Sequence, residues 1–405
     1  MIALSALPIL CIAVIGMISS PAILAAHAEA SGPAPALKIS YSLNGLGVVQ
    51  DNPVQSQDLW ERIRTGFRLA EVNPDLTRRH ERWYAERPQH LLRAIERSRL
   101  YLYHIVDEVA KRDMPMEVAL LPLIESAFNP MAQSPKQAAG IWQFIPSTGR
   151  VFGLQQNDWY DGRRDVLAAT RAALDYLQVL NRQFGSWDLA LAAYNCGEGC
   201  VARAIARNRA LGKPIAYAAL PLPTETRHYV PKLLAVRNLV REPEAAGIAL
   251  QTLANEPYFV QVRIDQPMPT RQVAKLADIS IEELLALNPA FQRRIIHTDT
   301  RGVLLLPADK VEIFHHNIQS KAAQRDGLQV YRGRRGESVS SIVERFGVTL
   351  EWLKEHNPLK YSRGKLVKDQ TLYVPMQAKT APPRLVQTET RSGNDGAGGK
   401  RKSET

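Results

Sequence analysis

The sequence contains little cysteine, and residues 1–28 carry no acidic or basic side chain. Three cysteines among 405 residues exclude a disulfide-rich scaffold. A hydrophobic fraction of 45% and a charged fraction of 22% exclude a wholly disordered chain and a polytopic membrane protein. No phosphate-binding loop or dinucleotide fingerprint occurs in a strand–helix context, and His315-His316 lies far in sequence from the cysteines. We therefore expect no cofactor and no metal.

The uncharged N-terminal segment predicts export. Leu7 to Leu24 is strongly apolar, and Ala26-His27-Ala28 is a small–x–small cleavage site. We expect residues 1–28 to be a signal peptide, with an uncleaved anchor helix as the alternative. Cys11 follows Leu10 rather than a small residue, which disfavours lipidation. Export would place the mature chain in the periplasm, where disulfides persist.

The two cysteines that remain after export are Cys196 and Cys200. Their spacing of four residues is compatible with adjacent turns of a helix, but Gly197 and Gly199 leave their true separation open. A bridge needs Cα atoms roughly 4.4 to 6.8 Å apart. A disulfide and a pair of small buried thiols therefore both remain open.

The net charge of +11 indicates an anionic partner: a nucleic acid, a membrane surface or an acidic polymer. The charge alone does not choose among them.

The sequence pattern divides the chain into a helical part and two smaller units that each mix strands and helices, called the first and second mixed units. We expect these boundaries: signal peptide 1–28, linker 29–57, helical lead-in 58–103, main helical domain 104–250, first unit 251–310, second unit 326–377, and a disordered basic tail 378–405. Within the helical part, one helix is predicted from Arg87-Pro88 to Asp113-Met114-Pro115, because apolar residues recur every three or four positions. Asp165 is predicted to cap the next long helix, and a last helix is predicted over residues 224–241.

The two units that follow repeat one order of elements. Residues 258–264 and 303–307 are strand-like and flank two short helical patterns, the second of which ends at Asn288-Pro289. The same order recurs from residue 330 to 375, where Asn357-Pro358 ends the second helix. This is an internal repeat of βααβ units.

A carboxylate ends the apolar segment from Met116 to Phe128. At helical spacing, continued to Phe128, Glu125 would share a face with Val118, Leu121 and Phe128. Burial there would raise its pKa, and a glutamic acid that is neutral at working pH can act as a general acid. The alternative is that Glu125 lies at the exposed end of the helix and binds water.

Two further motifs place polar side chains at the edge of apolar runs. The first, Gly140-Ile141-Trp142-Gln143-Phe144, sets a glycine turn before an amide. The second, Ala193-Tyr194-Asn195, ends an apolar helix before a glycine turn. Each motif is weak by itself, and the order and spacing of all three carry the specificity.

With Glu125-Ser126 before them, these motifs resemble the Glu-Ser, Gly-Leu-Met-Gln and Ala-Tyr-Asn motifs of family 1 lytic transglycosylases, whose SLT domain is lysozyme-like. Glu225 to Val230 is similar to the late helix of that family, whose Tyr approaches the catalytic Glu. The resemblance runs from about Asp58 to Val240. It implies a multidomain protein with an all-α lysozyme-like catalytic domain followed by small α/β units.

The resemblance further implies cleavage of the β-1,4 bond between N-acetylmuramic acid and N-acetylglucosamine, in cell wall turnover or remodelling. Glu125 would protonate the glycosidic oxygen and then deprotonate the muramyl 6-hydroxyl, which attacks C1 and leaves a 1,6-anhydro end. The implied substrate-binding residues are Ser134, Gln143, Phe144, Tyr194, Asn195 and Tyr229. Ordinary glycosidases use a second carboxylate, and Asp161, Asp165 and Glu198 are the candidates for one. We expect Arg163 and Arg164 to pair with these acids rather than with substrate.

The second mixed unit resembles a LysM module, which binds N-acetylglucosamine-containing glycans. The matching loops contain Gly336, Glu337, Ser338, Asn357 and Pro358. The first unit has Asp265 to Pro269 in place of the usual opening, so glycan binding and a spacer role remain equally open for it.

The predicted partner is therefore the peptidoglycan glycan strand, and no nucleic acid is expected. The charge fits attraction to carboxylates of the peptidoglycan stems. Peripheral association with the outer membrane and the oligomeric state are left open. The rival predictions are a goose-type muramidase that uses water as the nucleophile, and a catalytically silent wall-binding protein.

Overall fold

The structure is a computed structural model that describes residues 39–42, 57–297, 303–319 and 327–376. The predicted signal peptide, with Cys11, and the predicted basic tail lie outside these residues. Within the described ranges, no helix combines the length and the apolar character needed to cross a membrane.

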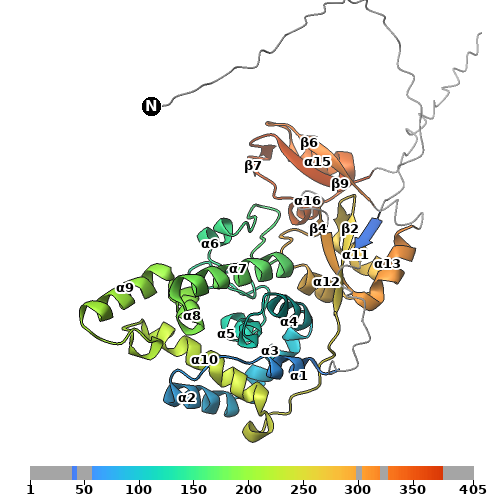
Figure 1. Cartoon of the computed structure of the whole chain (residues 1–405). Helices are drawn as coiled ribbons and strands as arrows, with labels where there is room; N and C mark the ends of the chain where they lie inside the picture. Colours follow the sequence, from blue (N-terminus) through green and yellow to red (C-terminus); the bar gives the residue numbers. More distant parts are fainter. Residues whose placement is uncertain (1–38, 43–56, 298–302, 320–326, 377–405) are drawn as a thin grey trace, which may run out of the picture. The chain divides into compact units, whose positions relative to one another are not determined.

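Helices make up almost all the regular structure between residues 57 and 247 (Figure 1). They are α1 (Leu59–Thr65), α2 (Pro74–Ala85), α3 (Pro88–Ser98), α4 (Leu102–Lys111), the 3-10 helix η1 (Met116–Leu120), α5 (Leu121–Ser126), α6 (Pro146–Val151), α7 (Val166–Phe184), α8 (Trp187–Cys196), α9 (Glu198–Ala210), η2 (Tyr217–Ala219), α10 (Thr224–Arg241) and η3 (Glu244–Ala246). Asp165 caps α7 by accepting a hydrogen bond from the Ala168 amide, as predicted. The last helix has the predicted bounds, 224–241.

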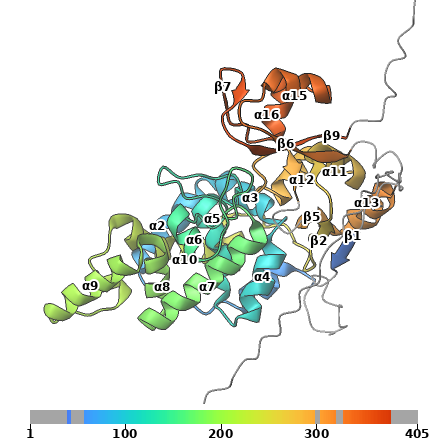
Figure 2. The same ribbon diagram turned by 90° about the horizontal axis from the view of Figure 1, so that it is seen from above.

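One hydrophobic core holds these helices together, and the short helix α5 lies in their midst (Figures 1 and 2). Trp60, Tyr101, Trp142 and Phe128 are among its largest fully buried side chains. Because α5 is surrounded by larger helices, a polar side chain at its end is shielded from water on several sides.

The single helix predicted from residue 88 is instead two helices, α3 and α4. The chain turns at residues 99–101, where the Ser98 hydroxyl donates to the Ile95 carbonyl at 2.6 Å. Tyr101 is 1% exposed, and its hydroxyl donates to the Ala286 carbonyl at 2.8 Å. The apolar periodicity continued across this break because both helices bury the same kind of face, and periodicity alone does not reveal a turn between them.

The first mixed unit contains a three-stranded antiparallel sheet in the order β1–β2–β5. Its elements are β2 (Phe259–Ile264), β3 (Met268–Pro269), α11 (Thr270–Ala277), α12 (Ile281–Leu287), β4 (Ile295–Ile296), β5 (Val303–Pro307), η5 (Ala308–Lys310) and α13 (Val311–Ile318). Strand β1 (Ile39–Ser42) comes from the segment expected to be a linker, and it pairs Ile39 with Ile264. Four residues are too short a run to separate a strand from a linker by sequence pattern.

The second mixed unit has the same order of strand, helix, helix and strand as the first, but no counterpart of β1 or α13 among its described residues. It consists of β6 (Leu328–Gly333), α15 (Val339–Phe346), α16 (Leu350–His356), β7 (Tyr361–Ser362), β8 (Lys365–Leu366) and β9 (Gln370–Pro375), with β6 antiparallel to β9. Its core contains Ile342, Leu353 and Val374. The predicted order of strand, helix, helix and strand is thus confirmed in both units.

One asparagine in each unit makes the same three hydrogen bonds. The Asn288 amide donates to the Leu284 and Leu305 carbonyls, and its oxygen accepts from the Leu305 amide at 2.8 Å. Asn357 makes the equivalent bonds to Leu353 and to Tyr373. Each side chain therefore ties the end of the second helix to the last strand, which explains the repeated Asn-Pro.

Candidate active site

Glu125 is the next-to-last residue of α5, where the chain leaves the helix through two strained residues. Ala127 and Phe128 both have left-handed backbone conformations, with φ of 51° and 54°. The expectation of a continuous helix to Phe128 was therefore wrong: a 3-10 helix, η1, leads into α5, which ends at Ser126. Such strain persists where the surrounding packing enforces it, and it is common at active sites. Here the left-handed turn lets Phe128 enter the core, where it is 0% exposed.

The Glu125 side chain is half-buried among aromatic and charged groups from α10. The Tyr229 hydroxyl donates a hydrogen bond to its Oε1. Lys232, one turn further along α10, donates from Nζ to the Ile124 carbonyl at 3.1 Å. Burial raises the pKa of Glu125 to about 7, while the hydrogen bond from Tyr229 and the positive charge of Lys232 act in the opposite direction. The carboxyl group is thus poised between its acid and base forms near neutral pH.

The Gly140 motif forms a tight loop beside the end of α5. The Ser126 hydroxyl donates to the Ile141 carbonyl at 3.0 Å, which joins the Glu-Ser motif to this loop. Gly140 has φ of +80°, and a Cβ built on it would lie 2.1 Å from the Arg163 carbonyl oxygen. No other residue fits there. The Gln143 amide donates to the Gly140 carbonyl at 2.8 Å, so this half-buried side chain also braces the loop.

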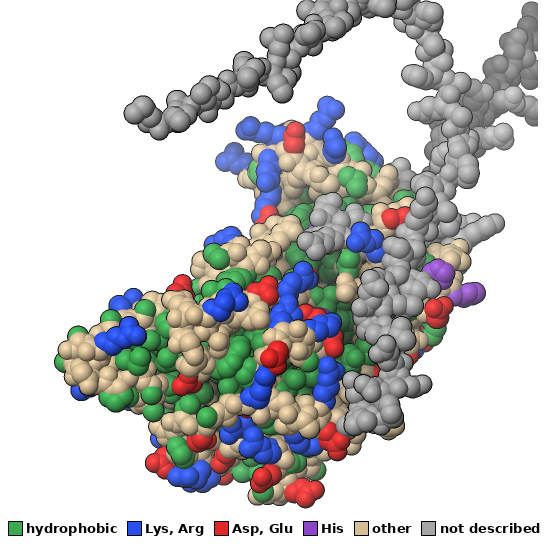
Figure 3. Space-filling view, viewed as in Figure 1, with side chains coloured by type: hydrophobic (Ala, Val, Ile, Leu, Met, Phe, Trp, Pro, Cys, Tyr) green, Lys and Arg blue, Asp and Glu red, His purple; other side chains and the backbone are tan. Residues whose placement is uncertain are grey.

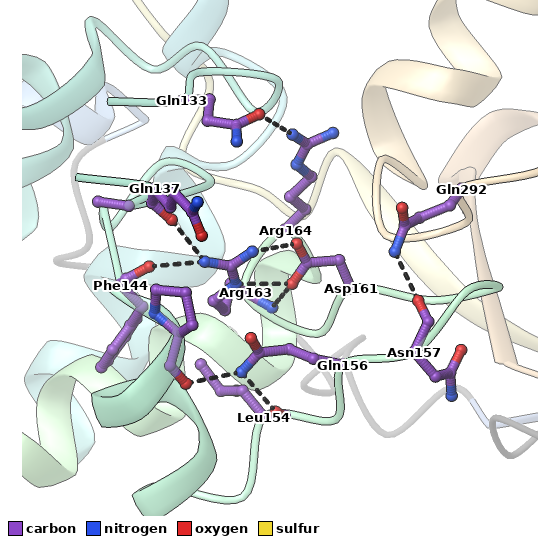
Figure 4. A network of polar contacts seen from close by, with 12 residues as sticks. Gln133, Gln137, Phe144, Leu154, Gln156, Asn157, Asp161, Arg163, Arg164 and Gln292 are labelled. Atoms are coloured by element: carbon purple, nitrogen blue, oxygen red, sulfur yellow. Dashed lines mark hydrogen bonds and ion pairs between the residues drawn. The ribbon is translucent and has the colours of Figure 1, made fainter. Parts of the chain in front are cut away.

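A buried ion pair fastens this loop to the segment before α7 (Figure 4). Arg163 donates to the Asp161 carboxylate through Nε at 2.9 Å and through Nη2 at 2.7 Å. Its Nη1 donates to the Gln137 carbonyl at 2.6 Å and to the Phe144 carbonyl at 3.3 Å. The expected pairing of Arg163 with an acid is confirmed, whereas Arg164 reaches Gln133 at 3.4 Å instead of a carboxylate.

Ser134 lies in the loop between α5 and the Gly140 motif. Its hydroxyl accepts from the Ala138 amide at 3.0 Å, and its own amide donates to the Ala138 carbonyl at 2.9 Å. Ser134 is half-buried and does not bond with Glu125. The lone pairs and proton that remain on its hydroxyl leave it able to bind a ligand.

Aromatic side chains form the other wall of the site. The Tyr194 hydroxyl donates to the Trp142 carbonyl at 2.8 Å, and its ring lies 6.4 Å from that of Phe144 and 5.6 Å from that of Tyr176. Burial and the nearby Glu125 carboxylate raise the Tyr194 pKa well above its usual range, so it remains a neutral hydrogen-bonding group. Asn195 accepts from the Thr226 hydroxyl at 2.7 Å, which joins α8 to α10.

The three candidates for a second carboxylate are all engaged elsewhere. Asp161 pairs with Arg163, and Asp165 caps α7 and accepts from Tyr160. Glu198 accepts from the Tyr176 hydroxyl at 3.0 Å. Among the described residues, the carboxylate that perturbs Glu125 is Glu225, an exposed side chain in the first turn of α10 that raises the Glu125 pKa.

Sequence reasoning missed Lys232 as a neighbour of Glu125. The sequence did indicate this proximity, because Lys232 lies three residues after Tyr229 and the two residues therefore share one face of the same helix. It also missed that Glu117, in the same apolar segment, is 0% exposed. The Glu117 carboxylate accepts from the Arg68 and Leu69 amides, so it orders the chain between α1 and α2.

The predicted glycan-binding residues of the second mixed unit occupy two of its loops. Glu337 accepts from the Tyr331 hydroxyl and from the Arg334 amide, and the Ser338 hydroxyl lies 2.7 Å from that of Ser340. Gly336 is exposed with φ of +84°, and Pro358 is half-buried. Asn357 is 1% exposed and bonds only within the unit, so its observed role is structural.

Cys196 and Cys200 form a disulfide, with their Cα atoms 5.9 Å apart. The bridge spans the Gly197 turn, at which α8 ends and α9 begins. In the described part of the chain, no group of three or more His, Cys, Asp or Glu side chains could hold a metal ion.

Comparisons with known proteins match the helical part of the chain and the first mixed unit. The family described as "Transglycosylase SLT domain" matches residues 103–216, and the family described as "Lytic transglycosylase MltD, LysM-like domain" matches residues 258–323. Membrane-bound lytic murein transglycosylase D of Escherichia coli K12 is 38% identical over 320 residues, which are 76% of this chain and 71% of that protein.

One further relative and one solved structure match smaller parts of this chain. A putative tributyltin chloride resistance protein of Alteromonas sp. is 39% identical over 42% of this chain and 80% of that protein. The solved structure of the 70 kDa soluble lytic transglycosylase of Escherichia coli covers 33% of this chain and 22% of its own, with 28% identity and a TM-score of 0.27.

Proposed function

The chain belongs to the SLT-domain lytic murein transglycosylases, and from this premise we propose that Glu125 serves in turn as the acid and the base of its reaction. The protein is a peptidoglycan lytic transglycosylase. The observation that carries the assignment of Glu125 is its position at the end of the buried helix α5, with a pKa of about 7 and a hydrogen bond from Tyr229.

The proposed reaction begins with the neutral form of Glu125. It donates its proton to the glycosidic oxygen between N-acetylmuramic acid and N-acetylglucosamine, and the bond from C1 to that oxygen breaks. The resulting carboxylate removes the proton from the muramyl 6-hydroxyl, whose oxygen bonds to C1. The products are an N-acetylglucosamine end and a 1,6-anhydromuramyl end, with no water consumed and Glu125 again protonated.

A single carboxyl group is sufficient for this route because the nucleophile belongs to the substrate. An internal hydroxyl replaces a bimolecular attack with a unimolecular one, which lowers the entropic part of the barrier. The engagement of Asp161, Asp165 and Glu198 in other bonds supports this one-carboxylate reading. Tyr229 and Lys232 would stabilise the carboxylate that forms midway.

The remaining site residues would hold the sugar rings. We assign Ser134 to the substrate N-acetyl group, and Gln143, Tyr194 and Phe144 to the walls that position the muramyl ring. Asn195 would act indirectly by joining α8 to α10 through Thr226. In the second mixed unit, the loops around Gly336–Ser338 and Pro358 would bind N-acetylglucosamine residues of the same strands.

We place the protein in the periplasm, where peptidoglycan lies. This location, cleavage after Ala28 and peripheral association with the outer membrane are tested together by cell fractionation and N-terminal sequencing of the mature chain. A chain that begins at Met1 in the cytoplasmic fraction would contradict the export proposal.

Product analysis tests the catalytic proposal. Purified protein is incubated with isolated sacculi, and the released muropeptides are analysed by mass spectrometry. Anhydromuramyl ends are expected from the wild type and not from Glu125→Gln. Reducing muramic acid ends would instead indicate a muramidase that uses water. Equal release by the wild type and Glu125→Gln would remove Glu125 from the mechanism.

A further inference from the structure

A pocket lies between α2 and α10, and one residue of its lining, Lys232, contacts the Ile124 carbonyl next to Glu125. Its volume is about 590 Å³. Helix α2 packs along α10 (Figure 1). The pocket is lined by Arg79, His80, Arg82, Trp83, Tyr84, Glu86, Arg87, His228 and Lys232. His228 lies in the Glu225 to Val230 segment and Lys232 contacts the Ile124 carbonyl, whereas the lining residues from α2 and Arg87 have no role in the proposed function.

The lining carries an excess of positive charge. Glu86, its one carboxylate, pairs with Arg87 at 3.0 Å and thereby neutralises that residue. Across the described ranges, neither the Arg79 nor the Arg82 side chain has a hydrogen bond or an ion pair. Both are exposed, and Figure 3 shows basic side chains on the surface over α2, with acidic ones at its edges. The pocket is therefore suited to an anion, and its two unpaired guanidinium groups can each bind a carboxylate through two N–H bonds.

The pocket also offers an aromatic surface. Trp83 is 42% exposed, its ring lies edge-on to Tyr84 with centroids 5.0 Å apart, and the Arg87 guanidinium lies 5.4 Å from its centroid. An exposed indole of this kind favours a ligand that has apolar as well as charged parts. A free inorganic anion would leave this surface unused.

Contacts along α10 join the pocket to Glu125. Nδ1 of His228, on α10, lies 3.1 Å from Nε2 of His80, on α2. The next residue, Tyr229, donates to Glu125. Lys232 lines the pocket and donates to the Ile124 carbonyl, directly before Glu125 in the chain. A ligand in this pocket would therefore lie within a few side-chain lengths of the reacting sugar.

We propose that this pocket binds a free carboxylate of the peptide stem attached to the muramyl residue whose bond is cleaved. The inference rests on the proposed function, because it takes that muramyl residue to lie at Glu125. The sugar rings of peptidoglycan are uncharged once the lactyl group is amidated, so the stem is the anionic part of the substrate. Its backbone and alanine methyl groups suit Trp83, and its carboxylates suit Arg79 and Arg82. The protein would then prefer glycan strands that retain their peptides.

The test compares two substrates and two double variants of the full chain. The substrates are soluble glycan strands that carry stem peptides, and the same strands after the lactyl amide bond has been hydrolysed and the product amidated with methylamine to restore neutrality. The test variant is Arg79→Gln with Arg82→Gln. The matched control is Arg207→Gln with Arg209→Gln, which removes two exposed positive charges from the last turn of α9. Circular dichroism and Tm verify the fold of both variants.

The expected result is a loss of about tenfold in kcat/KM on peptide-bearing strands for the α2 variant, with less than about twofold on stripped strands. Most of the loss should lie in KM. The loss should shrink as salt rises, because exposed charges are screened. The α9 control should remain within about twofold of the wild type on both substrates.

Several outcomes would overturn the inference. An equal loss on both substrates would indicate a general effect on the enzyme, and an equal loss in the α9 control would indicate non-specific attraction. A third outcome is that the Arg79→Gln, Arg82→Gln variant loses binding to phosphatidylglycerol vesicles while its ratio of kcat/KM on peptide-bearing and stripped strands equals that of the wild type. That result would assign the pocket to a lipid headgroup. The chemistry of the new ends is scored separately. Reducing ends from the wild type would contradict the proposed function, while the ratio between the two substrates would still decide the role of the pocket.

Discussion

The hydroxyl of Tyr229 on α10 donates a hydrogen bond to the Glu125 carboxyl at the end of α5. The two residues are separated by 104 positions in the sequence. This bond stabilises the carboxylate and so lowers the Glu125 pKa, whereas burial raises it to about 7. The balance between the two effects determines the pH range in which the acid form is present.

The first prediction concerns this pH range. If the neutral form of Glu125 is the reactive acid, kcat/KM should fall as pH rises through about 7. Tyr229→Phe removes the donor, so the carboxylate loses stabilisation, the pKa rises further and the alkaline limb moves to higher pH. Rate measurements from pH 5 to pH 9 on soluble strands test this. An unmoved limb in a folded Tyr229→Phe variant would separate that limb from Glu125.

The second prediction is that Glu125→Gln stabilises the protein at alkaline pH while its activity falls by about 10² to 10⁴. Because the folded-state pKa of Glu125 is raised above the unfolded value, the folded state binds the extra proton between about pH 4.5 and 7. The contribution of this group to stability therefore falls as pH rises through that range. Glutamine lacks the penalty, so the variant should gain about 1 to 2 kcal/mol at pH 8, allowing for partial exposure, and little at pH 5.

Glu117→Gln is the matched control for that measurement. Glu117 is a fully buried carboxylate that accepts two backbone hydrogen bonds and lies 3.8 Å from Arg237. Its neutralisation leaves a buried cation without its counter-charge, so Tm should fall at both pH 5 and pH 8. Thermal unfolding of both variants tests the difference. A destabilised Glu125→Gln at pH 8 would contradict the sign derived for Glu125.

A third prediction concerns the disulfide between Cys196 and Cys200. Closure of so short a loop restricts the unfolded chain, and its loss should cost about 2 kcal/mol. Cys196→Ser with Cys200→Ser should therefore lower Tm, and reductant should lower the wild-type Tm to the same value. Thiol titration of the denatured, unreduced protein provides the direct check, since two free thiols would rule out the bridge.

The fourth prediction concerns glycan binding by the second mixed unit. Ser338→Trp places a large ring in the loop that precedes α15 and should reduce co-sedimentation with sacculi by about fivefold, while cleavage of short soluble muropeptides is unchanged. Glu351→Trp, at an exposed position in the first turn of α16, is the matched control. Undiminished sedimentation of the Ser338→Trp variant would argue against a role for this loop.

The fifth prediction concerns the Gly140 loop. Gly140→Ala places a methyl group against the Arg163 carbonyl in a left-handed conformation, so the loop that carries Gln143 must move. We expect both lower activity and a loss of more than about 1 kcal/mol in stability. Gly153→Ala is the control, because its φ is +74° but a Cβ there meets nothing within 4 Å. If Gly140→Ala were as active as Gly153→Ala, the Gly140 loop would have no role in the reaction.

Local pattern alone determined the helical character of the catalytic part, the repeated βααβ units, the Asp165 cap and the identity of the three motifs. These features depend on periodicity and on neighbours a few residues apart, which the sequence contains directly. The break between α3 and α4 and the strand β1 were not predictable, because they depend on distant partners, the Ala286 carbonyl for Tyr101 and β2 for Ile39.

The site shows the same division. The sequence supplied Glu125 as the candidate acid and Tyr229 as its expected partner, since both stand in recognisable motifs. Only the tertiary structure brought Lys232 beside Ile124, selected Asp161 among the candidate acids as the partner of Arg163, and joined the cysteines. The pKa of Glu125 likewise depends on burial by helices far apart in the sequence, because desolvation is a property of the packed environment and not of the residue.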